Sequence, residues 1–301
     1  MLSSLPGPLI LLLSSILAIA NTAILVPVLL LLALIKLLIP VAPVRRVFSR
    51  LIIGVAETWI SINSFLVRAF TRADWQVTGL EHLQPDDWYL VLSNHQSWVD
   101  IVVLQDLCNR RIPLLKFFLK SQLIWVPLLG LAWWALDFPF MKRYSKEYLQ
   151  RHPELRGTDV EATRRACQKF AELPVSVMNF VEGTRFTPKK HAQQQSPFRY
   201  LLKPKVGGVA FVLETMGDML HAIVDITIVY PDGRPTLTDL LSGRVRRVLV
   251  DIRRREIPRE LLGGSYENDL AVREAFQQWI NRIWAEKDAL MAEQSRTAEQ
   301  S

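Results

Sequence analysis

The sequence is poor in cysteine and lacks the usual signatures of metal and nucleotide binding. Its 301 residues include only two cysteines, Cys108 and Cys167, and these do not form a CxxC pair. This spacing argues against a structural disulfide and fits a reducing compartment. The five histidines are scattered and form no HExxH pattern, so no metal site and no cofactor is expected. Neither GxxxxGKS/T nor GxGxxG occurs in the chain.

Nucleic acid is also not expected as a partner, although the chain carries a net charge of +7. The sequence contains no RNP, zinc-finger or basic-zipper pattern, and its basic residues are dispersed. Half of the residues are hydrophobic, and the excess is concentrated near the N-terminus. A basic surface beside an apolar segment favours an anionic bilayer or a phosphate-bearing substrate.

Residues 9–39 form an almost entirely apolar run, which is longer than the ~20 residues that a helix needs to cross a hydrocarbon core. No basic residue precedes this run and no small-residue cleavage site follows it, so a cleaved signal peptide is not expected. Basic residues lie at its end, and the positive-inside rule therefore places the rest of the chain on the cytoplasmic side. These residues are Lys36, Arg45, Arg46 and Arg50.

Two geometries of this apolar segment fit the sequence. One is a tilted single span, and the other is a helical hairpin bent near Asn21, Thr22 or Pro27. Residues 51–70 are apolar at helical spacing but contain Glu57. This pattern predicts an amphipathic helix that lies on the membrane or docks on the following domain, and not a second span.

The remaining composition is that of a globular α/β domain. We expect a membrane anchor with an amphipathic helix over residues 1–72, the α/β domain over 73–291, and a disordered tail over 292–301. Apolar and alternating runs predict strands at residues 75–78, 88–92, 113–119, 138–141, 175–181, 222–230 and 245–253. Helices are predicted at residues 98–109, 123–136, 145–173, 209–215 and 269–291, and a polar loop at 189–196.

His95 and Asp100 occupy the junction between a predicted strand and the helix after it, where α/β proteins often display functional groups. A neutral imidazole is the usual general base near pH 7, and a carboxylate can orient it and stabilise the imidazolium. No serine nucleophile belongs to this pair, so it suits activation of a hydroxyl supplied by a substrate. A structural interpretation competes: His95 faces solvent after the strand, and Asp100 forms a capping box with Ser97. Spacing alone favours the structural interpretation.

Glu182, Gly183, Thr184 and Arg185 follow the predicted strand at residues 175–181 directly. They would lie on the same edge of a parallel sheet as the histidine if both strands run alike. Glycine lets a ligand approach the backbone, and the planar guanidinium suits phosphate. The competing interpretation is a turn closed by a Glu–Arg ion pair.

Lys120 and Arg143 each follow an apolar run and could add positive charge at the same edge. Taken singly, each is better explained as a surface charge. A functional role for these two residues depends on their lying close to the two segments described above.

At this point the chain resembles a known family, the glycerolipid acyltransferases. Residues 94–100 resemble the family's NHxxxxD motif, residues 182–185 match its EGTR motif, and Lys120 with Arg143 resembles the block between them. The resemblance covers about residues 75–230, with the blocks in family order. Two further segments, residues 137–143 and 201–208, resemble the bacterial YihG-type branch, which is related to the lysocardiolipin acyltransferases.

One block departs from the family pattern. The last block of the family usually has a proline within its apolar run, whereas residues 223–228 here contain none. The lysocardiolipin-type branch instead tends to have Asp-x-Thr, as Asp225 and Thr227 provide here. The departure bears on the identity of the acceptor more than on the reaction.

The resemblance implies a mixed, largely parallel sheet flanked by helices, with an N-terminal membrane helix or hairpin, at the cytoplasmic side of a cell inner membrane. It implies that His95, oriented by Asp100, activates the hydroxyl of lysophosphatidic acid for attack on acyl-CoA or acyl-carrier protein. The product would be phosphatidic acid, with no metal and no covalent acyl-enzyme. The residues expected to hold the glycerol phosphate are Glu182, Gly183, Thr184, Arg185, Lys120 and Arg143.

Alternatives remain open at this level. The acceptor could be another lysophospholipid, such as lysophosphatidylglycerol or lysocardiolipin. A hydrolase would use water in place of the acceptor, and a lipid-binding adaptor would use the same fold without catalysis. Residues 123–136 or 51–70 are candidates for the floor of an acyl tunnel.

Overall fold

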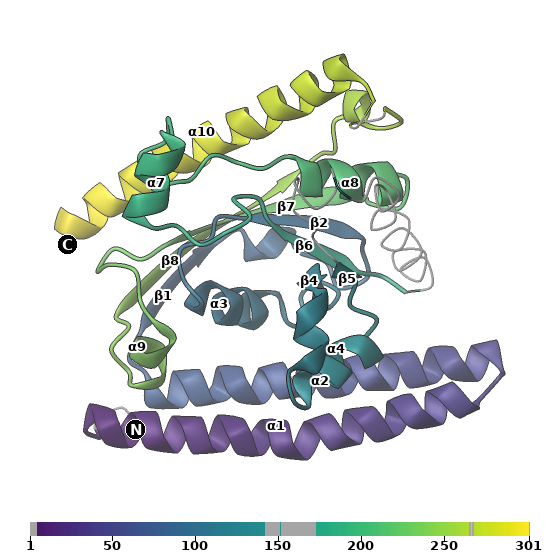
Figure 1. Cartoon of the computed structure of the whole chain (residues 1–301). Coiled ribbons are helices and arrows are strands. Elements are labelled where there is room, and N and C mark those ends of the chain that lie inside the picture. Colours follow the sequence, from purple (N-terminus) through teal and green to yellow (C-terminus); the bar gives the residue numbers. More distant parts are fainter. Residues whose placement is uncertain (1–4, 142–150, 152–172, 265, 267, 301) are drawn as a thin grey trace.

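The structure is a computed structural model that describes residues 5–141, 151, 173–264, 266 and 268–300. Figure 1 shows a central sheet with helices on both faces, above a hairpin of two long helices. Helices α8 (Gly207–Met216) and α10 (Leu270–Gln300) cover one face, and α3 (Val99–Cys108) lies on the other. The expected sheet flanked by helices, with a helical segment before it, is confirmed.

The main sheet has the strand order β1-β8-β7-β2-β6-β3. Strands β7, β2, β6 and β3 run parallel, whereas β8 is antiparallel to β7 and parallel to β1, so the sheet is mixed and largely parallel as expected. Its strands are β1 (Asp74–Thr78), β2 (Tyr89–Ser93), β3 (Leu115–Phe117), β6 (Ser176–Phe180), β7 (Ala222–Val229) and β8 (Arg247–Arg255). A separate pair joins β4 (Leu119–Lys120) to β5 (Phe140–Met141).

The central strands are buried on both faces because helices cover both sides of the sheet. Every residue of β2 and of β7 is buried, which explains why both strands are mostly apolar in the sequence. Ser93 at the end of β2 pairs with Phe180 at the end of β6. The loops after these two strands therefore emerge side by side. This arrangement allows the two candidate segments, residues 94–100 and 182–185, to meet.

The N-terminal helices form a hairpin, which is one of the two geometries that the sequence left open, but its turn lies further along the chain than expected. Helix α1 (Gly7–Leu38) continues through Asn21 and Pro27, and the chain reverses at residues 39–41 before α2 (Ala42–Phe70). The helix does not bend near Asn21, so that expectation is wrong. The side-chain amide of Asn21 instead donates across the hairpin to the carbonyl of Trp59 (3.0 Å) and to Asn63 (2.9 Å). The polar side chain of Asn21 thus joins α1 to α2. Both helices are long and apolar enough to cross a membrane.

Two further segments differ from expectation. The polar loop at residues 189–196 contains helix α7 (Pro188–Gln194), which Thr187 caps by accepting from the Lys190 amide at 3.2 Å. The tail, residues 292–301, is not disordered in its described part, because α10 continues to Gln300 and Arg247 donates to the carbonyl of Ala298 at 2.8 Å.

The strand predicted at residues 113–119 is divided between β3 and β4 because its two ends join different sheets. The remaining helices are η2 (Leu80–His82), η3 (Ser121–Trp125), α4 (Leu129–Ala135), α9 (Leu237–Leu241) and η6 (Arg259–Leu261). The helix predicted at residues 145–173 falls almost wholly outside the described residues.

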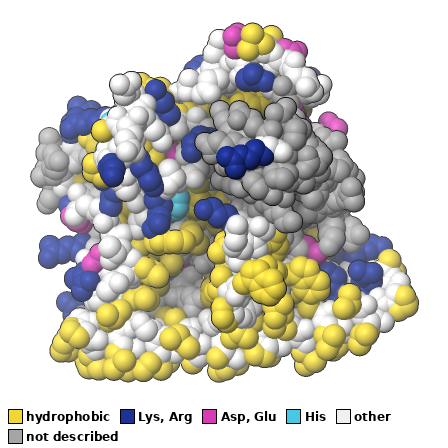
Figure 2. Space-filling view, viewed as in Figure 1, with side chains coloured by type: hydrophobic (Ala, Val, Ile, Leu, Met, Phe, Trp, Pro, Cys, Tyr) yellow, Lys and Arg dark blue, Asp and Glu magenta, His cyan; other side chains and the backbone are white. Residues whose placement is uncertain are grey.

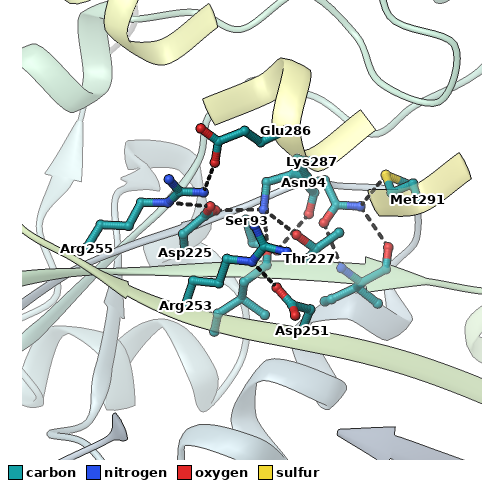
Figure 3. A network of polar contacts seen from close by, with 12 residues as sticks. Ser93, Asn94, Asp225, Thr227, Asp251, Arg253, Arg255, Glu286, Lys287 and Met291 are labelled. Atoms are coloured by element: carbon teal, nitrogen blue, oxygen red, sulfur yellow. Dashed lines mark hydrogen bonds and ion pairs between the residues drawn. The ribbon is translucent and has the colours of Figure 1, made fainter. Parts of the chain in front are cut away.

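A buried ionic network fastens α10 to the sheet (Figure 3). Phe276, Ile280, Trp284 and Lys287 lie three or four residues apart on one buried stripe of the helix. The Lys287 Nζ lies 2.7 Å from Asp225 Oδ1 of β7 and donates to the carbonyl of Ile226 at 2.7 Å.

Asp225 completes this network on its other side. Its Oδ2 accepts from Arg255 of β8 at 3.0 Å, and Arg255 also contacts Glu286 of α10 at 2.6 Å. Burial lowers the pKa of the Lys287 amine, while the charge of Asp225 opposes that shift. A buried lysine is therefore tolerated because a buried carboxylate compensates its charge.

Replacing Lys287 with methionine should lower the free energy of unfolding by roughly 3 kcal/mol, since removal of one partner from a buried ion pair leaves the other charge exposed to a low dielectric. The loss is not larger because Arg255 still contacts Asp225 in the variant. Thermal unfolding of the detergent-solubilised chain, followed by circular dichroism, measures it. Lys189→Met, at an exposed residue, is the control. Equal midpoints for the two variants would show that the network does not stabilise the fold.

Candidate active site

His95 lies in the loop between β2 and α3, and it meets Asp100 in the first turn of α3. The His95 Nδ1 lies 2.8 Å from Asp100 Oδ2. The Asp100 side chain is fully buried, whereas 12% of the His95 side chain is exposed. With Nδ1 donating to the carboxylate, Nε2 is the ring nitrogen that keeps a lone pair. The contact expected from the sequence is present, and it leaves one imidazole nitrogen available to a ligand.

The Asp100 carboxylate also organises the loop around the histidine. Its Oδ2 accepts from the backbone amides of Gln96 (2.6 Å) and Ser97 (2.9 Å), and its Oδ1 accepts from the Tyr230 hydroxyl (2.7 Å). Burial, followed by the charge of Asp100, raises the pKa of Tyr230 well above its ordinary value, so this hydroxyl keeps the proton that it donates. Four donors thus hold one carboxylate.

The capping interpretation of the sequence is only half correct. Ser97 is not the N-cap of α3, because that position belongs to Trp98 and the Ser97 hydroxyl accepts from the Val99 amide at 3.0 Å. The other half of the box is present, since the carboxylate of Asp100 accepts from the Ser97 amide. Asp100 Oδ2 accepts from the loop amides and also contacts the imidazole. Asp100 can therefore both cap the loop and orient His95.

The strands on either side hold the histidine in place. The imidazole stacks on Phe180 at the end of β6, with ring centroids 3.9 Å apart and planes inclined by 14°. The side chain of Asn94 bridges to β7, donating to the carbonyl of Ile228 (2.8 Å) and accepting from its amide (2.9 Å). The loop is therefore anchored to both neighbours of β2.

Glu182 lies beneath the loop and not at an open surface. It is fully buried, its Oε1 accepts from the His95 amide, and its Oε2 accepts from the Leu202 amide, each at 3.0 Å. The Phe186 amide donates to the His95 carbonyl at 2.8 Å. Both backbone groups of His95 are thus tied to residues 182–186, and Glu182 positions the histidine.

Gly183, Thr184 and Arg185 lie closer to the surface than Glu182. Gly183 has a φ of 67°, and a Cβ there would approach the Lys205 side chain to 3.1 Å. The Thr184 hydroxyl accepts from Lys190 Nζ at 2.7 Å. The exposed guanidinium of Arg185 stacks over the ring of Trp98, 4.5 Å from its centroid, which places it beside the histidine loop.

Four basic residues surround residues 183–186, and only one of them, Arg185, was predicted from the sequence. The four are Arg185, Lys190, Lys205 and Arg234, and we call them the basic cluster. Arg234 follows β7 and stacks over Phe186 at 3.9 Å, and burial lowers its pKa. Its signal in the sequence was its place after a strand parallel to β2, at the same edge of the sheet.

Lys120 and Arg143 are the two other residues predicted to hold the phosphate. Lys120 ends β4, which follows β3 of the main sheet closely along the chain and pairs with β5 in a separate sheet, and its role in phosphate binding stays a prediction. Arg143 lies outside the described residues. Among the residues that the structure describes, no group of three or more histidine, cysteine or acidic side chains could hold a metal ion.

Apolar surface borders the candidate site. Figure 2 shows a histidine between Lys and Arg side chains, directly above a broad hydrophobic band over the helical hairpin. A pocket of about 300 Å³ opens between α1, α2, α3 and α4. Trp98, which follows the histidine loop, and Ile101 line one part of it, and Val26, Ile60 and Ala132 line another. A basic cluster, an accessible imidazole and an apolar pocket therefore converge.

The sequence profile of the Acyltransferase family matches residues 74–231, more than half of the chain, and the chain belongs to this family. It is 28% identical over 228 residues to 1-acyl-sn-glycerol-3-phosphate acyltransferase gamma of Mus musculus, covering 70% of this chain and 53% of that protein. It is 26% identical over 249 residues to lysocardiolipin acyltransferase 1 of Gallus gallus, covering 78% of this chain and 61% of that protein.

A solved structure has the same fold. The crystal structure of the 1-acyl-sn-glycerophosphate (LPA) acyltransferase PlsC from Thermotoga maritima superposes with a TM-score of 0.51. The match covers 92% of this chain and 96% of that protein, at 16% sequence identity. The chain spans only about half to three fifths of the two curated relatives named above.

Glu182 should make the stability of the fold depend on pH. Burial raises its pKa to about 7, and its bonds to the His95 and Leu202 amides oppose the shift only in part. Between pH 4.5, its ordinary pKa, and about 7 the folded chain retains a proton that the unfolded chain has released. The free energy of unfolding therefore falls as the pH rises through this window.

Between pH 5 and 8, the wild type should lose roughly 2–3 kcal/mol of unfolding free energy that Glu182→Gln does not lose, at about 1.4 kcal/mol per pH unit. Denaturant unfolding at several pH values measures the difference. Glu293→Gln, at an exposed position on α10, should follow the wild type. Parallel curves for the wild type and Glu182→Gln would contradict the raised pKa.

Proposed function

We propose that this chain transfers a fatty acyl group from an acyl thioester to the free hydroxyl of a lysophospholipid, with lysophosphatidic acid as the first candidate and phosphatidic acid as its product. The observation that carries the proposal is the His95–Asp100 contact of 2.8 Å beside the basic cluster. Membership in the Acyltransferase family and the names of the similar proteins support it.

In the proposed reaction, Nε2 of His95 takes the proton of the acceptor hydroxyl as its oxygen attacks the thioester carbonyl. The oxygen–carbon bond forms, the carbon–sulfur bond breaks, and the histidine returns the proton to the departing thiolate. Asp100 holds the imidazole by Nδ1 and stabilises the imidazolium. The acceptor supplies the nucleophile, so the mechanism uses no covalent acyl-enzyme. Either acyl-CoA or acyl-carrier protein can donate the acyl group.

The basic cluster is the proposed site of the acceptor phosphate. Guanidinium groups pair with phosphate oxygens in a bidentate manner, and lysines add point charges. Arg185 and Arg234 flank residues 182–186 by stacking on Trp98 and Phe186. In this proposal the phosphate is bound by Arg185, Lys190, Lys205 and Arg234. Glu182 instead accepts from the His95 amide and positions the histidine.

The hairpin would bring this site to the bilayer that holds the substrate. The exposed large hydrophobic residues of the chain are concentrated on α1 and α2, for example Leu12, Ile19, Leu31 and Leu38. Such a face is stable only against lipid or another apolar surface. We place the chain at the cytoplasmic side of a cell inner membrane, with the hairpin embedded and the acyl chain of the donor in the apolar pocket.

Other acceptors remain within this proposal. The similarity to lysocardiolipin acyltransferase 1 and the Asp225–Thr227 pair favour lysocardiolipin or lysophosphatidylglycerol as second candidates, in line with the YihG-type resemblance. A hydrolase or a lipid-binding adaptor would be the answer from another class. An oriented base is not required for lipid binding alone, and this favours a catalyst over an adaptor.

His95→Ala should lower the rate of acyl transfer by roughly 10²–10⁴-fold, because it removes the general base while leaving the Asp100 carboxylate with its other donors. The assay follows release of free thiol with lysophosphatidic acid, lysophosphatidylglycerol or lysocardiolipin as acceptor. His82→Ala, which removes an exposed histidine, is the control and should retain activity.

The outcomes of this assay separate the candidates. Full activity of His95→Ala would contradict the mechanism, and thiol release without any lipid acceptor would indicate a hydrolase. Transfer to lysophosphatidylglycerol or lysocardiolipin but not to lysophosphatidic acid would reassign the acceptor. Lipid binding by the wild type without thiol release would indicate an adaptor.

Val102→Trp should shorten the acyl chain that the protein accepts. Val102 of α3 lines the apolar pocket and is half-buried, so a larger ring there fills space that a long chain would use. We expect the ratio of rates with a sixteen-carbon donor and a ten-carbon donor to fall about tenfold, since loss of roughly two buried methylenes is worth about 1.5 kcal/mol. Val47→Trp, at an exposed position on α2, is the control. An unchanged ratio would place the donor chain elsewhere.

A further inference from the structure

A second cavity, distinct from the candidate active site, lies at the turn of the helical hairpin. Its volume is about 570 Å³, and it opens between α1, α2, the end of α4 and β3. None of the described residues that line it belongs to the histidine loop or to the basic cluster. It shares one wall, Leu136, with the apolar pocket. We call it the turn cavity.

The polar side chains of the turn cavity carry an excess of positive charge. Lys36 from α1, Arg45 and Arg46 from the first turns of α2, and Lys116 from β3 all line it. Asp137 is the acidic residue among the described lining residues, and its carboxylate lies 3.4 Å from the Lys36 amine. Among the described lining residues, four basic side chains against one acidic side chain give a net charge of +3, which favours an anion inside the cavity.

The backbone and the floor of the turn cavity add to this preference. Ala42, the first residue of α2, lines the cavity, so the positive end of the helix dipole adds to the charge of the side chains. Ile52, Ile53 and Leu136 form an apolar part of the same wall. A ligand with an anionic head and an apolar body fits such a lining better than a small inorganic ion.

The position of the cavity points to a lipid as the source of that ligand. The residues beside the turn are exposed and apolar, and they continue the face that the hairpin presents outward: Leu34, Leu37, Leu38, Val41, Val44 and Val47. Figure 2 shows Lys and Arg side chains above the turn end of the hairpin, next to the hydrophobic lower rim. Basic side chains just above an apolar face lie at the depth of phospholipid headgroups.

We propose that the turn cavity binds the phosphate headgroup of one anionic phospholipid from the bilayer, at a site separate from the acceptor site. The phosphate lies among Arg45, Arg46 and Lys116, and the acyl chains lie along the outer face of the hairpin. Such a lipid would fix the hairpin turn at the headgroup layer. The proposal concerns binding alone and does not depend on acyl transfer.

The test measures lipid binding to the full-length chain in neutral detergent by native mass spectrometry. Phosphatidylglycerol, phosphatidylcholine and inorganic phosphate are added separately. We expect one phosphatidylglycerol to bind at concentrations at least tenfold lower than phosphatidylcholine requires. Arg46→Glu should weaken this binding at least tenfold. Arg50→Glu, one helical turn further along α2 and outside the cavity, is the matched control and should change it less than about twofold.

Each other result would overturn the proposal in a distinct way. Equal binding of the two lipids would exclude an anionic headgroup site. Equal losses in the two variants would show that the surface charge of α2 attracts the lipid without the cavity. Inorganic phosphate bound as tightly as phosphatidylglycerol, and lost in Arg46→Glu, would make the source a soluble phosphate. Because turnover is not measured, an error in the proposed reaction leaves these outcomes unchanged.

Discussion

The carboxylate of Asp100 is the constraint on which the rest of the site depends. A fully buried carboxylate needs hydrogen-bond donors, because burying an unpaired charge costs several kcal/mol. The chain supplies these donors from the His95 ring, from the amides of Gln96 and Ser97, and from the Tyr230 hydroxyl beyond the end of β7. The loop therefore closes around the carboxylate, and the orientation of the imidazole follows from the same closure. Structure and proposed catalysis use one interaction.

Two other buried carboxylates extend this arrangement to the edge of the sheet and to α10. Glu182 joins the loop after β6 to the His95 amide, and Asp225 joins β7 to Lys287 of α10. Apolar packing alone would not specify which loop meets which, since it is not directional. Hydrogen bonds to buried carboxyl groups are directional, so they favour a single arrangement of β2, β6 and β7.

The hairpin relates this arrangement to lipid. It packs beneath α3 and α4, on the side of the molecule where the apolar pocket opens (Figure 1). Its outer face is apolar, and the turn cavity with its basic residues lies at one end. Three neighbouring surfaces of one molecule would then bind lipid groups. The basic cluster would bind the acceptor, the apolar pocket the acyl chain, and the turn cavity a bilayer headgroup.

The sequence was sufficient to predict the elements whose signal is local. Apolar runs predicted the strands β2, β6 and β7, and the spacing of His95 and Asp100 placed both at one junction between a strand and a helix, because these patterns depend on neighbouring residues. The partners that come from distant parts of the chain could be found only from the folded structure. Tyr230 lies 130 residues from Asp100, and Glu182 lies 87 residues from His95. The turn of the hairpin was likewise decided by contacts between its helices, since Asn21 reaches α2 instead of breaking α1. No local pattern records such contacts, because the hydrogen bonds exist only once the sheet and the hairpin have formed.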